Sequence, residues 1–303
     1  MKIFVTGVNG QLGHDVVNEL IGRGYEAFGS GTAEKYSGKQ DGTFVCSAPY
    51  YQLDIRDREK VLQLLEKIRP DAVIHCAAWT DVDGAEDRRS EVLAVNSNGT
   101  ANIKDACKYL DCKLMYISTD YVFNGRGTDP WSADSLDYDP VNVYGLSKMA
   151  GEQAVTDTMK KFFIVRISWV FGSNGKNFVD TMLHAGQKYP KLRVVDDQIG
   201  RPTYTLDLAV LLADMIATDK YGIYHASNEG EYISWYDFAK EIFRQANMSV
   251  EVVPVSTEEY GISKAKRPMN SRLDTGKLAE QGFRQLPVWQ DALERYLVAS
   301  GSR

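Results

Sequence analysis

The 303-residue sequence lacks several features that would assign its class at once. Its four cysteines form no CxxC pair and have no zinc spacing, which argues against a disulfide-rich secreted domain and a structural zinc site: Cys46, Cys76, Cys107 and Cys112. No run approaches the ~20 apolar residues of a membrane span. The N-terminal MKIFVTG turns glycine-rich too early for a signal peptide. With a net charge of −6 and no dense basic run, a nucleic-acid partner is disfavoured. We therefore expect a cytoplasmic protein with reduced thiols and no membrane or nucleic-acid partner.

The remaining composition is that of a globular protein with a large core, since 44% of residues are apolar and 25% are charged. From residue 2 to residue 169, short apolar runs alternate with stretches of helical periodicity. This alternation predicts an α/β fold with a doubly wound parallel sheet of the Rossmann type. The runs expected to be strands are 2–6, 25–30, 72–78, 114–118 and 162–169.

Two segments of this half have weaker patterns, and the pattern changes beyond Gly172. Residues 31–51 have no period and are expected to be a surface insertion, whereas 86–110 is expected to be one long helix with a polar NSNG stretch inside it. We predict a dinucleotide-binding domain over 1–172, with 205–227 returning to it. A smaller C-terminal α/β lobe, mainly 173–303, is expected to bind the substrate.

A glycine-rich loop, GVNGQLG at residues 7–13, follows the first predicted strand and precedes a helical pattern. In that context, glycines allow a tight turn and let the backbone approach a pyrophosphate, which sits at the N-terminus of the helix. The spacing is GxxGxxG rather than GxGxxG, and a glycine-rich turn without a ligand is the alternative. The position directly after the first strand favours dinucleotide binding.

The end of the second predicted strand bears on the choice of cofactor. An acidic residue there would bind the adenosine ribose of NAD, but the sequence continues as GSGT at 29–32, with Lys35 nearby. Small hydroxyl side chains such as Ser30, together with a cation, could accept a 2′-phosphate. NADPH is therefore favoured over NADH, and an ordinary polar loop is the alternative.

Tyr144 and Lys148 are four residues apart, so in a helix they lie on one face. Asn142 is positioned to cap that helix. A nearby ammonium would lower the pKa of the phenol towards the working range of an acid–base catalyst. Thr119 lies at the C-terminal edge of the predicted buried strand 114–118, where it could face this helix. Tyrosine–lysine pairs at this spacing are often only solvated surface residues, so the pair acquires meaning from its context. His75, inside an apolar run, is expected to be a packed histidine rather than a metal ligand.

The glycine loop, Thr119, Tyr144 and Lys148 together resemble the extended short-chain dehydrogenase/reductases over almost the whole chain. Within this group the sequence is similar to the dTDP-4-dehydrorhamnose reductase family. The YxxxK pattern alone is loose, whereas STDYVF and RPxNS together are more specific. The segments that carry the closer similarity are GVNGQLG (7–13), AAWT (77–80) with VD (82–83) and AE (85–86), STDYVF (118–123), SWVF (168–171), GRPT (200–203) and RPMNS (267–271).

The resemblance implies roles for individual residues. Thr119, Tyr144 and Lys148 would be catalytic. Gly10, Gln11 and Leu12 would contact the pyrophosphate, Asp54 and Ile55 the adenine, and Ala77 and Ala78 the ribose side. The full set of expected cofactor residues is Gly7, Gly10, Gln11, Leu12, Gly13, Ser30, Asp54, Ile55, Ala77, Ala78, Trp79, Tyr144 and Lys148. The expected substrate residues are Thr119 and Asp120 at the sugar, Trp169 at the sugar nucleotide, and Arg201, Arg267 and Arg272 at the diphosphate. Guanidinium groups suit phosphate oxygens, although surface ion pairs are the alternative for each arginine.

The reaction implied is reduction of the C4 keto group of a nucleotide-diphosphate sugar by NADPH or NADH, most closely dTDP-4-dehydrorhamnose to dTDP-rhamnose. An epimerase or dehydratase of the same superfamily is a second reading. Dehydratases follow the threonine with Asp-Glu, whereas here Thr119 is followed by Asp120-Tyr121. A third reading is a non-catalytic regulatory subunit of a methionine adenosyltransferase, against which the intact Thr/Tyr/Lys set argues.

Family members can use magnesium held by carboxylates at a dimer contact. Only Asp15 stands in a suggestive place, and it could equally favour the N-terminus of its helix. No metal is assigned, although a magnesium requirement and a homodimer both stay open.

Overall fold

A seven-stranded parallel sheet forms the centre of the computed structural model, which describes residues 1–302. Its strand order is β11-β6-β5-β4-β1-β2-β3, which confirms the predicted doubly wound α/β fold. The strands are β1 (Lys2–Thr6), β2 (Glu26–Gly31), β3 (Tyr50–Gln52), β4 (Ala72–His75), β5 (Lys113–Thr119), β6 (Phe162–Ile167) and β11 (Gly222–Ala226). The order reverses between β1 and β4, and ligands bind beside such a switch point at the carboxyl ends of the strands.

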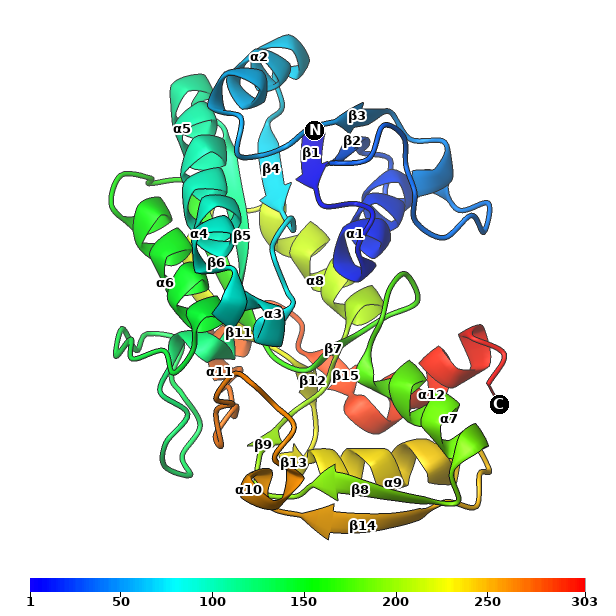
Figure 1. Ribbon diagram of the computed structural model, residues 1–303. Helices are drawn as coiled ribbons and strands as arrows, with labels where there is room; N and C mark the ends of the chain where they lie inside the picture. Colours follow the sequence, from blue (N-terminus) through cyan, green and yellow to red (C-terminus); the bar gives the residue numbers. More distant parts are fainter. Residues whose placement is uncertain (303) are drawn as a thin grey trace.

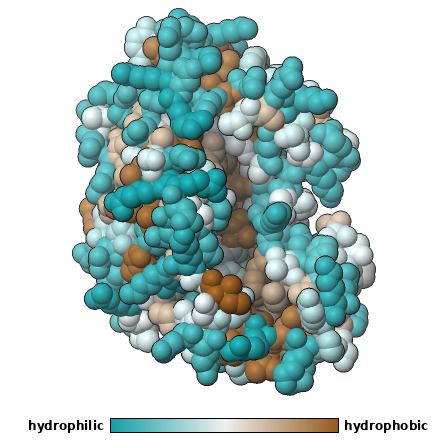
Figure 2. Space-filling view, in the orientation of Figure 1, coloured by the Kyte–Doolittle hydropathy of each residue, from teal (hydrophilic) through white to brown (hydrophobic). Residues whose placement is uncertain are grey.

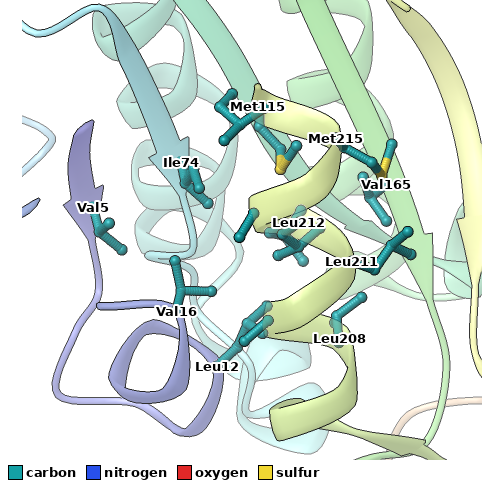
Figure 3. Close-up of a cluster of buried hydrophobic side chains, with 14 of the residues drawn as sticks. Val5, Leu12, Val16, Ile74, Met115, Val165, Leu208, Leu211, Leu212 and Met215 are labelled. Atoms are coloured by element: carbon teal, nitrogen blue, oxygen red, sulfur yellow. The ribbon is translucent and has the colours of Figure 1, made fainter. Parts of the chain in front are cut away.

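Helices cover both faces of this sheet (Figure 1). α1 (Gln11–Gly22) and α8 (Thr205–Ile216) pack together on one face, and α2 (Arg58–Ile68), α5 (Thr100–Leu110) and α6 (Val143–Thr156) cover the other. Figure 3 shows side chains of α8 directed at the strands, with Leu212 near Ile74 and Met115 of the sheet. All three are fully buried. Removal of this apolar surface from water stabilises the two layers and fixes the strand ends at which the cleft forms.

The C-terminal half adds a smaller layered unit below the sheet in Figure 1. Strand β8 (Lys191–Val195) pairs in parallel with β14 (Glu251–Val255), and α9 (Trp235–Gln245) packs on them. α9 begins with a reciprocal capping box formed by Ser234 and Asp237. The other elements of this half are β7 (Val170–Phe171), α7 (Phe178–Lys188), β9 (Ile199–Gly200), β10 (Thr203–Tyr204), β12 (Asn228–Glu229), β13 (Ile233–Ser234), α10 (Thr257–Tyr260), α11 (Gly276–Glu280), β15 (Leu286–Val288) and α12 (Trp289–Ala299).

Two segments differ from their sequence-based expectation. The expected insertion at 31–51 contains a 3-10 turn at Phe44–Cys46 and begins the edge strand β3, which is too short to show a period. The expected single helix at 86–110 is divided into α3 (Val82–Asp87), α4 (Arg89–Leu93), a π-helical segment (Ala94–Gly99) and α5. Asn96 explains the irregularity: its buried amide accepts from the Trp79 backbone N–H at 2.7 Å and donates to Ser147 Oγ at 2.9 Å.

No helix among residues 1–302 is long and apolar enough to cross a membrane. No group of three or more His, Cys, Asp or Glu side chains within that range is arranged to hold a metal ion. His75 is buried and hydrogen-bonded to Thr6 at 2.7 Å and to Thr100 at 3.1 Å, as expected for a packed histidine.

Candidate active site

A cleft of about 1180 Å³ lies at the carboxyl ends of the strands. Figure 2 shows the surface hollowed near the middle of the molecule, between the sheet and the lower unit. The structure brings most of the residues expected from the sequence to its wall: Gly7, Gly10, Gln11, Leu12, Gly13, Ser30, Asp54, Ile55, Ala77, Ala78, Trp79, Thr119, Asp120, Tyr144, Lys148, Trp169 and Arg267. Arg201 and Arg272 are not part of it.

The glycine loop lines part of the cleft. Gly7 has φ of +74°, and a Cβ there would lie 2.7 Å from the backbone of Ala77. A Cβ on Gly13 would lie 2.4 Å from the Gly7 carbonyl oxygen, so only glycine allows helix and loop to approach this closely. α1 begins with no side-chain cap, and Oε1 of Gln11 is buried without a hydrogen-bond partner in the described chain. Uncapped N–H groups at a helix start fit a pyrophosphate.

A cationic side chain, Arg56, lines the cleft beside β2, and the sequence analysis did not predict it. Arg56 lines the cleft together with Ser30, Gly31 and Thr32, whereas Lys35 does not. The Arg56 guanidinium donates to both carboxylate oxygens of Asp54 at 2.6–3.0 Å, and this holds the pKa of that carboxyl below its usual value. Arg56 could have been identified from the sequence, because it lies two residues after Asp54 in the segment that follows β3.

Thr119, Tyr144 and Lys148 all line the cleft. The predicted cap of α6 is confirmed, because Asn142 Oδ1 accepts the Gly145 N–H at 2.8 Å. Burial raises the pKa of the Tyr144 phenol above its usual value, and a hydrogen bond with Thr119 opposes that shift. The sequence predicted that Lys148 would lower the pKa of Tyr144, and the structure does not show this lowering. The ammonium of Lys148 instead donates to the Ile117 carbonyl at 2.7 Å.

Lys148 is almost completely buried, with 3% of its surface exposed. Desolvation of the ammonium lowers the pKa of Lys148 to about 7, and the carboxylate of Glu152 one helical turn later acts against this shift. The Tyr116 ring also lies below the ammonium, 4.1 Å from Nζ to the ring centroid. Lys148 therefore changes its charge close to neutral pH, which is the range in which proton-transfer catalysts operate.

The opposite wall carries aromatic and cationic side chains. Trp169 has φ of +48° and stacks on Trp235 with ring centroids 3.7 Å apart, and both rings line the cleft. Trp235 belongs to a distant helix, so nothing in its local sequence pointed to the cleft. Arg267 donates to Asp83 at 2.8 Å and to the Tyr121 hydroxyl at 3.3 Å.

Two of the three expected arginines lie elsewhere. Arg201 is 5% exposed and directs its guanidinium to Ser227 at 2.9 Å and Thr275 at 3.0 Å, beside Glu229. Arg272 donates to Asn270 Oδ1 at 3.0 Å. The Arg201 side chain therefore ties the segment after β11 to Thr275, whereas the Arg272 contact stays within the 267–275 segment.

Asp15 is also buried in the protein interior. It accepts a hydrogen bond from Thr205 of α8 at 2.5 Å, and burial raises its pKa to about 6. A carboxyl in this setting ties α1 to α8.

A doubly wound sheet with an uncapped glycine turn after β1, and with threonine, tyrosine and lysine meeting in the cleft, defines the extended short-chain dehydrogenase/reductase class. Similarity to known proteins places the chain in one family within this class. The profile described as the RmlD substrate binding domain matches residues 1–301, and the chain belongs to that family.

Similar proteins of known name cover nearly the whole chain. It is 35% identical over 306 residues to a dTDP-4-dehydrorhamnose reductase of Aggregatibacter actinomycetemcomitans, with 97% of each chain covered. It is 37% identical over 296 residues to the spore coat polysaccharide biosynthesis protein SpsK of Bacillus subtilis, with 98% and 96% covered. Among solved structures, dTDP-4-dehydrorhamnose reductase from Bacillus anthracis in complex with NADP is 41% identical, with a TM-score of 0.88 and 98% and 99% covered.

Proposed function

We propose that the protein is an NADPH-dependent dTDP-4-dehydrorhamnose reductase, which reduces the C4 keto group of a nucleotide-diphosphate sugar to give dTDP-rhamnose. One observation carries the proposal: Thr119, Tyr144 and Lys148 line the same cleft as the glycine turn. The relatives bearing this reductase name, at 35% and 36% identity, support the substrate. The NADP complex of the B. anthracis protein supports the cofactor. NADH is the weaker candidate, because β2 ends without an acidic residue.

In this mechanism NADPH supplies the hydride that reaches the keto carbon. Tyr144 donates its proton to the ketone oxygen, and its raised pKa keeps that proton in place until the oxygen becomes basic. Lys148 offers N–H donors to the nicotinamide ribose. Thr119 hydrogen-bonds the reacting oxygen. The remaining expected cofactor contacts are proposed at the glycine turn, at Asp54 and Ile55 for the adenine, and at the 77–79 segment.

We place the sugar nucleotide against the opposite wall. The Trp169–Trp235 stack offers an aromatic surface, and Arg267 offers a guanidinium for the diphosphate. Arg267 suits this role better than Arg201 or Arg272, which lie outside the cleft wall. The division into a dinucleotide-binding domain and a substrate lobe stays a proposal of the same kind. In this division the sugar nucleotide binds between the two units.

The direct test is incubation of the purified protein with dTDP-4-dehydrorhamnose and either NADPH or NADH, with loss of reduced cofactor and identification of the sugar as readouts. We expect one equivalent of NADPH to be consumed for each dTDP-rhamnose formed. An epimerase regenerates its bound cofactor, so conversion without net NADPH consumption would contradict the proposal. So would an absence of reaction combined with co-purification of a methionine adenosyltransferase.

The Arg56 guanidinium is predicted to select NADPH. Removing a charge-assisted hydrogen bond costs about 1.5–3 kcal/mol, so Arg56→Ala should raise KM for NADPH by about 10-fold to 150-fold and leave KM for NADH nearly unchanged. Lys35→Ala is the matched control, since Lys35 lies close in sequence but does not line the cleft. An equal rise in KM for both cofactors would show that Arg56 does not read the 2′-phosphate.

We also propose that the protein works in the cytoplasm, where sugar nucleotides and NADPH are made. All four cysteines are free thiols, as is typical of proteins in a reducing compartment. The homodimer allowed by the resemblance stays a prediction, and the molecular mass in solution would test it.

A further inference from the structure

Asp120 is a buried carboxyl group at the cleft wall whose chemistry the reaction described above does not use. It follows β5 directly, as the first residue of a 3-10 turn (Asp120–Val122), and only 2% of its surface is exposed. Its Oδ1 accepts a hydrogen bond from Thr119 Oγ1 at 3.0 Å. Its Oδ2 is buried and has no hydrogen-bond partner among residues 1–302.

The groups around Asp120 do not neutralise a negative charge. Tyr121 and Arg267 bond each other, and Arg267 also pairs with Asp83 rather than with Asp120. Lys148, on α6, directs its ammonium at the Ile117 carbonyl.

Hydroxyl groups are the main polar neighbours of the carboxyl, from Thr119 on β5 and Ser271 on the C-terminal segment. A buried carboxylate with one oxygen unpaired is costly, and burial accordingly raises the pKa of Asp120 to about 6. The carboxyl therefore holds a proton more readily than an ordinary aspartate does.

Thr119 lies between Asp120 and the proposed acid. The Thr119 side chain interacts with the Tyr144 phenol, and its hydroxyl donates to Asp120 Oδ1 at 3.0 Å. A threonine hydroxyl both donates and accepts and can rotate, so it can take a proton from one side while giving its own to the other. Asp120 also lines the cleft.

We propose that Asp120 is the proton source that restores Tyr144 after each turnover, acting through the hydroxyl of Thr119. The inference rests on the proposed reductase function, in which Tyr144 is left as a phenolate. The Thr119 O–H bond breaks as its proton joins the phenolate oxygen, and the Asp120 carboxyl proton forms the new bond to Thr119 Oγ1. The net change is one proton moved from Asp120 to Tyr144. Asp120 then takes a proton from water, and no electrons are exchanged with an outside reagent.

The test is Asp120→Asn, which retains the shape and an oxygen to accept from Thr119 but cannot give up a proton. Stopped-flow mixing with dTDP-4-dehydrorhamnose and NADPH separates the first turnover from later ones. Because Tyr144 starts out protonated, the first turnover at saturating substrate should slow much less than later turnovers. Later turnovers should slow by about 10-fold to 100-fold, at the low end of a general acid–base contribution. The trace should therefore show a burst of one NADPH per active site.

The matched control is Asp137→Asn, an exposed aspartate of the loop before α6, which should leave both phases unchanged. An equal slowing of the first and later turnovers would overturn the inference, since Asp120 would then act only by holding the sugar. Unchanged steady-state turnover would also overturn it. If the unmodified protein consumes no NADPH, the proposed function itself fails, which is a distinguishable result.

A second measurement keeps the inference testable if Asp120→Asn does not fold. In the unmodified protein, the steady-state rate should fall as pH rises through the pKa of Asp120, because only the protonated carboxyl can supply the relay. The first-turnover rate should not follow that titration, since it uses the proton already on Tyr144. A first-turnover rate that falls in parallel with the steady-state rate would contradict the relay.

Discussion

Replacing Tyr144 by phenylalanine should lower kcat by about 10²-fold to 10⁴-fold, the usual contribution of a positioned acid, and leave the affinity for NADPH almost unchanged. The substitution removes one hydroxyl and keeps the ring, whose edge-on contact with Tyr121 has its centroids 5.5 Å apart. The fold around α6 should therefore persist, and the ketone oxygen would lose its proton donor. Steady-state kinetics, together with a fluorescence titration of NADPH, would measure both effects.

Tyr109→Phe provides the matched control, because Tyr109 lies on α5 with 68% of its surface exposed. It should behave as the unmodified protein in both assays. If Tyr144→Phe retained full turnover, the proton would have to come from another group, and the assignment of the acid would be wrong. If NADPH binding fell as much as kcat, the hydroxyl would be acting mainly in cofactor positioning.

The extent to which the sequence predicts this site depends on how local each signal is. Thr119, Tyr144 and the glycine turn could be found because strand, loop and helix patterns place them at strand ends or on one helix face. Trp235 could not, because its place in the cleft depends on how separate elements pack.

The same limit applies to the fold and to the electrostatics. Long apolar strands such as β5 have a readable pattern, whereas the three-residue β3 and the π-helical segment do not. The spacing of Tyr144 and Lys148 placed them on one face but could not reveal their burial, which sets the direction of both pKa shifts.

Arg166→Met should lower the free energy of unfolding by about 3–5 kcal/mol, because it leaves a buried carboxylate without its cation. Arg166 on β6 and Glu152 on α6 are both fully buried, and the guanidinium donates to Glu152 at 2.7 Å and 2.9 Å. It also donates to the Tyr138 hydroxyl at 3.1 Å and to the Ser135 carbonyl at 3.1 Å. Urea denaturation followed by circular dichroism would measure the loss.

Two comparisons decide whether the loss comes from the unpaired charge. Arg244→Met removes an exposed partner of Glu241 and should change the unfolding midpoint little, because solvent screens that pair. The double variant Arg166→Met with Glu152→Met removes both charges and should be more stable than Arg166→Met alone, since no carboxylate stays buried and unpaired. If the double variant were less stable than the single one, packing around Arg166 rather than charge pairing would dominate, and Glu152 would not be what makes Arg166 necessary.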